Sequence, residues 1–414
     1  MDLSQKEGIE GVQFAVTGGQ GFVGAALSLE LLRRGAQEVR FFDLRASSSW
    51  SHQLLDAGVR VFQGDVRNKE DVERLFRDVD CVFHLASYGM SGKEIVHAGQ
   101  ADEVNINGTC NVLDACNEHG VKRLVYVSTH SVVFGGQPIV NGNEELPYFP
   151  IDDHVDVYGR SISIAEQLVL KSNGQQTKKG TPVAAGQAYF ICDGAPVNTF
   201  EFIISPLCRS LGYMVPRVTL DPSVFLAISK IILFVSTLLY PWLDSIWTPQ
   251  PLILPAEVYE PIILPAEVYE LGVTHYFSYL KAKEELGYVP RTSSLEGLAA
   301  TISYFQERKR RELDGPTIFT WLASLTASLA AFSAACLPPV GPLKWVLAIH
   351  LFVFRSILVL RVVLAVVFVL HVVEGIIAWF LARKIDPRNA RGWFWQTVAL
   401  GILSLRFLLK RAMA

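Results

Sequence analysis

The amino-acid sequence predicts a doubly wound parallel α/β domain followed by a helical membrane domain. Short apolar segments alternate with amphipathic helical patterns between residues 12 and 128. This alternation is typical of repeated βαβ units, and therefore of a parallel sheet covered by helices on both faces. A glycine-rich turn separates the first apolar segment from the first helical pattern. Beyond about residue 315 charged side chains become sparse and long apolar segments begin.

The alternation defines each expected element of the first domain. Strands are expected at residues 12–16, 38–42, 59–64, 81–86 and 123–128, and helices at residues 25–34, 69–77 and 104–118. Ligands of such sheets bind outside the carboxyl ends of the strands. The polar or small residues at those ends should therefore line a cleft: Asp65, His84, Ala86, Ser87, Ser128 and Thr129.

The turn at residues 17–24 reads Thr-Gly-Gly-Gln-Gly-Phe-Val-Gly. In a Rossmann-type site, Gly18 would allow the tight turn, Gly21 the approach of a pyrophosphate to the backbone, and Gly24 the close packing of helix on strand. Phe22 and Val23 lie at the helix N-terminus, which attracts phosphate charge. The pattern predicts a dinucleotide site more strongly than a plain glycine-rich surface turn.

Asp43 supports this prediction and bears on the choice of cofactor. It ends the second expected strand, about 20 residues after the glycine turn, where a carboxylate can bind the adenosine ribose. A carboxylate at that place accepts a hydrogen bond from a ribose 2′-hydroxyl and repels a 2′-phosphate, which favours NAD. Arg45 keeps NADP open as the alternative, because an arginine nearby can accommodate the extra phosphate.

Composition narrows the class of protein and its compartment. The net charge of -3, from 37 basic and 40 acidic residues, argues against nucleic acid as the main partner. The six cysteines show neither paired nor metal-ligand spacing, so we expect free thiols in a reducing compartment, with Cys81 buried in its strand. Residues 1–11 are polar and unlike a signal peptide. The first domain is therefore expected in the cytosol.

Further motifs follow the glycine turn in order: Asp65-Val66, His84-Leu85-Ala86-Ser87, VNINGT at 104–109, YVST at 126–129 and YGRSI at 158–162. Together they resemble the extended short-chain dehydrogenases/reductases. Segments such as SYGMSGKE, YFICDGAPVN and GVTHYFS resemble the 3β-hydroxysteroid-dehydrogenase-like branch, family 42E. The resemblance spans roughly residues 10–290.

This resemblance implies hydride transfer between a carbinol carbon of a steroid or related lipid alcohol and a nicotinamide cofactor. It also implies the acid/base role of Tyr158 and the substrate-orienting role of Thr129, with Ser128 as its nearest substitute. A homodimer is a further expectation. The remaining cofactor-binding positions implied are Asp65, Val66, Leu85, Ala86, Ser87 and Ile162.

Ile162 departs from the family pattern, which is Tyr-x-x-x-Lys on one helix. The lysine lowers the pKa of the tyrosine and holds the nicotinamide ribose, and isoleucine can do neither. Arg160 lies about 200° around the helix from Tyr158 and cannot replace it, and Lys171 lies several turns away. The alternative function is therefore a catalytically impaired nucleotide-binding or membrane-interaction protein, either a pseudoenzyme or the product of a defective gene model.

A second departure follows the helix that carries Tyr158. The segment 163–194 passes almost directly to a much later strand of the family pattern, so we expect the sixth sheet strand and much of the substrate pocket to be absent. PLILPAEVYE at 251–260 is followed at once by PIILPAEVYE at 261–270. Each copy contains prolines that would interrupt a helix, so we expect a tandem duplication inserted as a loop.

The last part of the chain predicts membrane spans. The basic run 308–311 precedes an apolar stretch at 317–337, and a second stretch at 357–382 ends in Arg383-Lys384. Residues 393–409 are a shorter third candidate, either spanning, re-entrant or interfacial. We therefore expect a multi-pass protein of the endoplasmic reticulum membrane, with its first domain in the cytosol. Residues 224–247 are either a membrane-touching helix or a buried core helix.

Ionisable residues occur inside the second expected span. His371 and Glu374 share one helix face, and Arg361 lies toward the other end. Such groups are either functional or a mutually satisfied pair that joins helices, and the second interpretation is favoured. This region resembles transmembrane protein 254. We expect a nucleotide-binding Rossmann domain at 10–186 and the remnant of a substrate-binding domain at 187–300. A basic linker at 301–316 and a helical membrane domain at 317–414 follow.

Overall fold

The computed structural model describes residues 8–45, 47–48, 50–89, 98–154, 156–173, 184–194, 196–211, 213, 215, 223–231, 234, 265–311, 313, 315–338, 340–341 and 343–413. The chain divides into two compact units, Met1–Leu298 and Ala299–Ala414. The finer division of the first unit at residue 186 stays a prediction.

A five-stranded parallel sheet forms the centre of the first unit. Its strand order is β3-β2-β1-β4-β5, so the chain winds outward in both directions from the neighbours β1 and β4. This confirms the predicted fold class. Ligands of such sheets bind at the point where the winding reverses. The strands are β1 (Gln13–Thr17), β2 (Glu38–Asp43), β3 (Arg60–Gln63), β4 (Cys81–His84) and β5 (Arg123–Tyr126).

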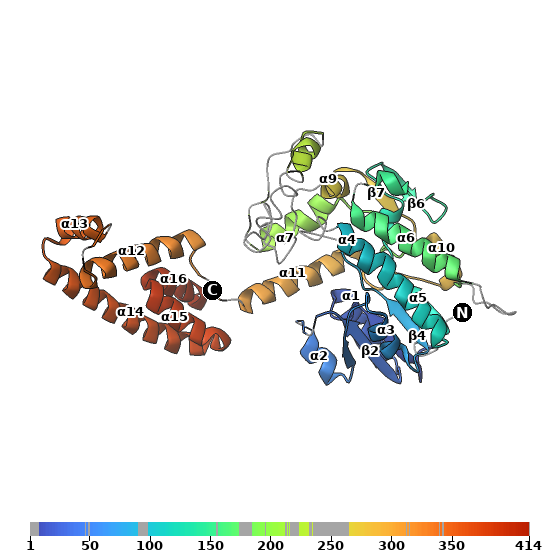
Figure 1. Ribbon diagram of the computed structural model, residues 1–414, viewed down its shortest axis with the longest axis horizontal. Helices are drawn as coiled ribbons and strands as arrows, with labels where there is room; N and C mark the ends of the chain where they lie inside the picture. Colours follow the sequence, from blue (N-terminus) through green and yellow to red (C-terminus); the bar gives the residue numbers. More distant parts are fainter. Residues whose placement is uncertain are drawn as a thin grey trace. The chain divides into compact units, whose positions relative to one another are not determined.

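Helices cover both faces of this sheet, which is blue to cyan in Figure 1. Alternate residues of β1 separate the two cores: Phe14 and Val16 pack with α1 (Phe22–Arg33) and α2 (Ser51–Asp56), whereas Ala15 packs with α3 (Lys69–Phe76) and α5 (Gly108–Glu118). All six cysteines are free, and Cys81 is buried as predicted.

Further helices follow along the chain up to residue 311. They are α4 (Ala98–Ala101), the π-helix η2 (Asp102–Asn107), the 3-10 helices η3 (His130–Val132) and η4 (Ile151–Asp153), α6 (Val157–Ser172), the π-helix η5 (Thr199–Ile204), α7 (Ser205–Ser210), α10 (Leu280–Leu286) and α11 (Ser294–Arg311).

The sheet ends at β5 within the part of the chain that the structure describes. Val125 on this edge strand is 44% exposed, whereas Val82 on the neighbouring β4 is fully buried. An uncovered apolar edge is what the absence of a sixth strand predicts, and such an edge favours aggregation.

The second copy of the ten-residue repeat corrects one prediction. Residues from Pro265 onward form the helix α9 (Pro265–Gly272), in which Val268 is buried, so this copy is not a loop. Proline is tolerated here because it stands in the first turn, where its missing N–H has no partner to lose. The helix leads into β7 (His275–Phe277), which pairs with β6 (Ile139–Gly142). Residues 251–264 lie outside the described residues. Of the predicted apolar segment 224–247, residues 224–231 are helical and most of the rest lies outside the described residues.

Two helices of the second unit are long and apolar enough to cross a membrane. Residues Phe319–Cys336 of α12 (Ile318–Cys336) have a mean hydropathy of 1.4, and α14 (Ile357–Ile385) has 2.6. Both coincide with predicted spans. The helix α13 (Leu343–Phe354) was not predicted, because its 12 residues are too short for a span. Arg361 of α14 donates to the carbonyl of Ala335 in α12.

The third candidate span is two helices, α15 (Ala390–Leu400) and α16 (Ile402–Met413), separated by Gly401 at a φ of 58°. Both pack against α14. Arg411 in α16 pairs with Asp386, which follows α14, at 2.9 Å, and the indole of Trp393 donates to the same carboxylate. This ion pair brings the end of α16 back to the end of α14, so residues 390–413 form a helical hairpin and not one continuous helix. Whether the hairpin is re-entrant or interfacial stays a prediction.

His371 and Glu374 face this hairpin, because a side chain at Gly401 would collide with both. His371 Nδ1 donates to the carbonyl of Val398 at 3.2 Å. Glu374 Oε2 is buried and has no hydrogen-bond partner among the described residues. Of the predicted mutually satisfied pair, His371 therefore has a hydrogen-bond partner, whereas this oxygen of Glu374 has none among the described residues.

Candidate nucleotide and catalytic site

The glycine turn lies directly against the end of β4. Gly18 has a φ of 71°, which favours glycine, and a Cβ there would lie 2.9 Å from the backbone nitrogen of Ala86. A Cβ at Gly24 would collide with the carbonyl oxygen of Gly18, whereas one at Gly21 would meet only that oxygen at 3.2 Å. The turn is thus a backbone cradle that larger residues would fill.

The first turn of α1 is open to solvent beside this cradle. Gly21 caps the helix without any side-chain hydrogen bond, and Phe22 and Val23 are 73% and 58% exposed. The first N–H groups of a helix have no partner within it, so they can bind an anion. The arrangement fits a pyrophosphate.

Asp43 holds the glycine turn in place. Its carboxylate is buried and accepts hydrogen bonds from the backbone N–H of Gln20 at 3.0 Å and of Arg45 at 3.0 Å. Gln20 is itself buried and bonds Ser48 through its side chain. Sequence reasoning missed Gln20, because its position between two glycines gives no signal for a supporting role.

Asp65 and Val66 follow β3 but serve different purposes. The Asp65 carboxylate pairs with Arg67 at 2.6 Å, and this hydrogen bond lowers the pKa of Asp65. Val66 is buried in the sheet core and lies under Gly108. Of the two, only Asp65 has a polar side chain, and Arg67 already pairs with it.

His84 does not line the cleft, which corrects the prediction. It is fully buried, with Nδ1 2.7 Å from Thr17 Oγ1 and Nε2 3.0 Å from Thr109 Oγ1. Thr17 Oγ1 also accepts the backbone N–H groups of Leu85 and Ala86, both at 3.2 Å. This network sets the backbone of the predicted cofactor-binding residues that follow β4. Burial lowers the pKa of His84 to about 4.

The stability of the first unit is expected to fall as the pH is lowered from about 6.5 to about 4. In this range unfolded His84 binds a proton with its usual pKa of 6.5, whereas folded His84 holds its pKa at about 4. The unfolded state binds more protons, so the free energy of unfolding falls with decreasing pH, by about 3 kcal/mol at about 1.4 kcal/mol per pKa unit. Denaturation of wild type and His84→Gln at pH 7 and pH 4 measures this. Glutamine can bond both threonines without titrating, so identical pH dependence of the two chains would contradict the assignment.

Tyr158 stands in the first turn of α6, which Asp156 caps by accepting the N–H of Gly159 at 2.6 Å. Burial raises the pKa of Tyr158, against a smaller lowering by its hydrogen bond with Ser87. The predicted acid/base therefore lies near Ser87 in the loop after β4. An elevated pKa favours the neutral phenol, which is the opposite of what proton abstraction needs.

Asn105 was also missed by sequence reasoning. It is buried at the π-helix η2, where its side chain exchanges two 2.8 Å hydrogen bonds with the backbone of Tyr88 and donates to Ser161 Oγ at 2.8 Å. It therefore ties the loop after β4 to α6. A π-helical turn is frequent at functional sites, but it has no signature in a single sequence.

Ile162 lies one turn after Tyr158 on the same face of α6. Its side chain is 2% exposed and packs with Val132, Val133 and Phe134. An isoleucine side chain has no charge and no hydrogen-bonding atom to offer Tyr158. Its neighbours Val132, Val133 and Phe134 are apolar too, so they do not replace the missing lysine.

Thr129 and Ser128 lie close to α6. Thr129 caps η3 by accepting the N–H of Ser131 at 3.3 Å, and a Cβ at Gly159 would lie 3.2 Å from the Ser131 Cβ. The structure thus places Thr129 and Tyr158 on adjoining elements. Ser128 Oγ is buried and has no hydrogen-bond partner in the described part of the chain.

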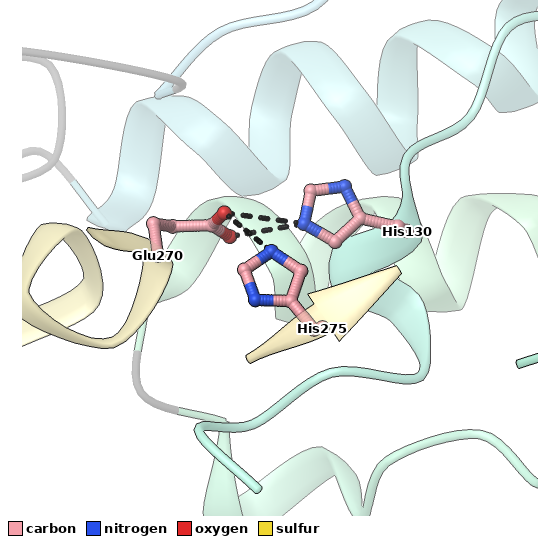
Figure 2. A group of neighbouring side chains, drawn as sticks. All are labelled: His130, Glu270 and His275. Atoms are coloured by element: carbon pink, nitrogen blue, oxygen red, sulfur yellow. Dashed lines mark hydrogen bonds and ion pairs between the residues drawn. The ribbon is translucent and has the colours of Figure 1, made fainter. Parts of the chain in front are cut away.

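A cluster that sequence reasoning missed lies next to Thr129. His130, Glu270 and His275 bring their side chains together from η3, α9 and β7 (Figure 2). Burial opposes ionisation of Glu270, but hydrogen bonds from the two histidines outweigh it and lower the pKa of Glu270 to about 2. The histidine at 130 and the pair at 270 and 275 are too far apart in sequence to form a recognisable motif.

The sheet order, the glycine turn at its switch point and a tyrosine on the helix after β5 define a protein of the short-chain dehydrogenase/reductase class. The model of the 3-beta hydroxysteroid dehydrogenase/isomerase family matches residues 15–183, and that of transmembrane protein 254 matches residues 316–410. The chain is 34% identical to short-chain dehydrogenase/reductase family 42E member 1 of Danio rerio, covering 82% of this chain and 100% of the relative. The chain therefore belongs to family 42E of the short-chain dehydrogenases/reductases, which is a family of oxidoreductases.

More distant similarities agree with this assignment. A 3-beta-hydroxysteroid dehydrogenase of Mycolicibacterium neoaurum is 29% identical over 70% of this chain and 91% of its own. The crystal structure of gox2253 has a TM-score of 0.51 at 20% identity, over 72% of this chain and 98% of that one, which supports the fold alone.

Proposed function

We propose that this chain is a membrane-anchored oxidoreductase that binds NAD, with NADP as the alternative, and acts on the CH–OH group of a steroid or related lipid alcohol. The observation that carries the proposal is the cradle of Gly18 and Gly24 beside the open first turn of α1, with Tyr158 and Ser87 at the same end of the sheet. The names of the steroid dehydrogenase relatives support the substrate class.

The residues present fit the adenosine and pyrophosphate parts of the cofactor better than its nicotinamide part. The cradle and Asp43 suit the first two, whereas buried Ile162 gives the nicotinamide ribose no polar partner. When bound, the nicotinamide ring would supply the hydride acceptor. Tyr158 would then exchange a proton with the substrate hydroxyl, which Ser128 and Thr129 would orient.

Membrane anchoring is supported by the apolar helices α12 and α14. The basic residues 308–311 precede α12, and positive charge is retained on the cytosolic side of membrane proteins. We therefore propose a cytosolic first unit on the endoplasmic reticulum membrane. A lipid alcohol that partitions into the bilayer would be concentrated near such an enzyme.

The second candidate is a nucleotide-binding membrane protein with impaired catalysis. It is favoured by one observation, the isoleucine in place of lysine within an apolar cluster that also contacts Tyr158. Both candidates bind the cofactor, and they differ in turnover.

Cofactor binding and turnover of the full chain in phosphatidylcholine vesicles test the proposal. We expect NADH to bind, as seen by energy transfer from tryptophan, and a 3β-hydroxysteroid to be oxidised slowly in the presence of NAD. Tyr158→Phe should abolish the oxidation and preserve binding. NADH binding without any turnover would favour the second candidate, and absence of NADH binding would contradict both.

A further inference from the structure

Two histidines direct the same ring nitrogen at one carboxylate (Figure 2). His130 Nε2 lies 3.1 Å from Glu270 Oε1 and 3.3 Å from Oε2, and His275 Nε2 lies 3.2 Å from Oε2. All three candidate ligand atoms lie within 4.8 Å of one another. The side chains are shielded but not sealed: His130 and Glu270 are each 34% exposed and His275 is 13% exposed.

The proton on His275 is positioned in a way that points to a cation. Its Nδ1 lies 2.8 Å from the carbonyl oxygen of Val273, so Nδ1 carries a hydrogen that it donates. In a neutral imidazole the lone pair is then on Nε2, facing the negative oxygens of Glu270. That arrangement is repulsive unless a cation lies between them, either a second proton or a metal ion. A carbonyl that accepts the second ring N–H is the usual support of a metal-binding histidine.

The two imidazole rings stack beside the carboxylate, so both present a ring nitrogen to the same place. The imidazoles of His130 and His275 are 5.2 Å apart between centroids and inclined by 15°. One divalent ion can bind both rings in their neutral form together with the carboxylate of Glu270. The ring of Phe134 also stacks on His275, at 4.2 Å between centroids, and packs near His130.

The spacing and the donor types match zinc. Ligand atoms held about 2.0–2.1 Å from a tetrahedral zinc ion lie about 3.3 Å apart, close to the nitrogen–oxygen distances here. Two imidazoles and one carboxylate form a known zinc ligand set that leaves a fourth position for water. Hard ions such as Mg²⁺ and Ca²⁺ prefer oxygen ligands only.

We propose that His130, Glu270 and His275 form a binding site for one divalent zinc-class metal ion. Because the ligands come from η3, α9 and β7, the ion would fasten the C-terminal part of the first unit to the turn that follows Thr129. The ligand from α9 is the last residue of the second repeat copy. The duplication therefore takes part in the site, and the equivalent residue of the first copy, Glu260, provides a matched control.

Metal binding to the full chain, purified in detergent without a polyhistidine tag, tests this site. We expect one zinc ion per chain by isothermal titration calorimetry and a higher melting temperature with zinc. His130→Ala, His275→Ala and Glu270→Gln should each weaken zinc by more than the about 10- to 100-fold typical of losing a supporting hydrogen bond. His52→Ala should change nothing, because His52 and Asp56 form only an exposed surface pair.

Cobalt substitution keeps the test decisive where a variant does not fold. Intense visible absorption bands of a four- or five-coordinate Co²⁺ ion, without a thiolate band, are expected for the wild-type chain. The weak spectrum of hydrated Co²⁺, or equal zinc affinity of wild type and His130→Ala/His275→Ala, would overturn the site and leave a protonated histidine brace. Loss of binding in Glu260→Gln but not in Glu270→Gln would overturn the assignment of the carboxylate. None of these outcomes depends on cofactor binding or turnover.

Discussion

Replacing Ile162 by lysine is expected to raise the rate of alcohol oxidation by about 100-fold or more, since general acid–base catalysis contributes about 10²- to 10⁴-fold. Residues 158 and 162 share one face of α6, so the new ammonium would lie one turn from the Tyr158 hydroxyl. It would stabilise the phenolate and lower the pKa of Tyr158, which burial raises in the present chain. The dependence of kcat on pH measures this. Because Tyr158 must lose its proton to act as the base, the rising limb of the profile at low pH should move to lower pH.

The same substitution places a charge where Ile162 is 2% exposed, so it should also lower the melting temperature. Ile162→Met, which keeps the site apolar and of similar volume, is the control and should leave both rate and pH profile unchanged. A lysine variant that is folded and binds NADH, yet shows no turnover, would locate the defect in the reduced substrate pocket. The impaired nucleotide-binding protein would then be the better description of this chain.

Replacing Gly24 by valine is expected to weaken NADH binding by about 100-fold or more. The added side chain would collide with the carbonyl oxygen of Gly18, and overpacking of this kind costs about 3 kcal/mol in severe cases, equivalent to about 100-fold in affinity. The turn must move away from α1 to admit it, which deforms the proposed pyrophosphate cradle. Fluorescence titration with NADH measures the loss.

Gly99→Val is the matched control for this experiment, because a Cβ at Gly99 meets no atom within 4 Å. It should leave NADH affinity unchanged. Circular dichroism of both variants separates a local change in the turn from loss of the sheet. If folded Gly24→Val bound NADH as tightly as wild type, the dinucleotide site would have to be elsewhere in the chain.

The nucleotide half of the site could be predicted well because its signals are local. Apolar alternation identified all five strands of the parallel sheet, though not β6 and β7. The glycine spacing identified the tight turn, which needs the positive φ of Gly18. Ile162 could be recognised as an anomaly from its distance to Tyr158 alone. In each case the information lies within a few residues or one turn of a helix.

The corrections concern contacts between distant segments. His84 occupies a strand end, where polar residues usually meet ligands, but the hydroxyls of Thr17 and Thr109 bury it. The second repeat copy contains Pro265, yet it forms a helix because this proline falls in the first turn. The hairpin at Gly401 is closed by the ion pair of Asp386 and Arg411, which no apolar pattern reveals.

The sequence by itself determined the class of the fold, the place of the glycine turn and the apolar character of the last hundred or so residues, because periodicity and residue type act locally. Only the tertiary structure decided which polar side chains are buried as supports and which meet in a site. His130 and Glu270 are 140 residues apart and share no pattern. They converge because α9 and β7 pack beside the turn after β5, and that packing depends on the folded chain as a whole.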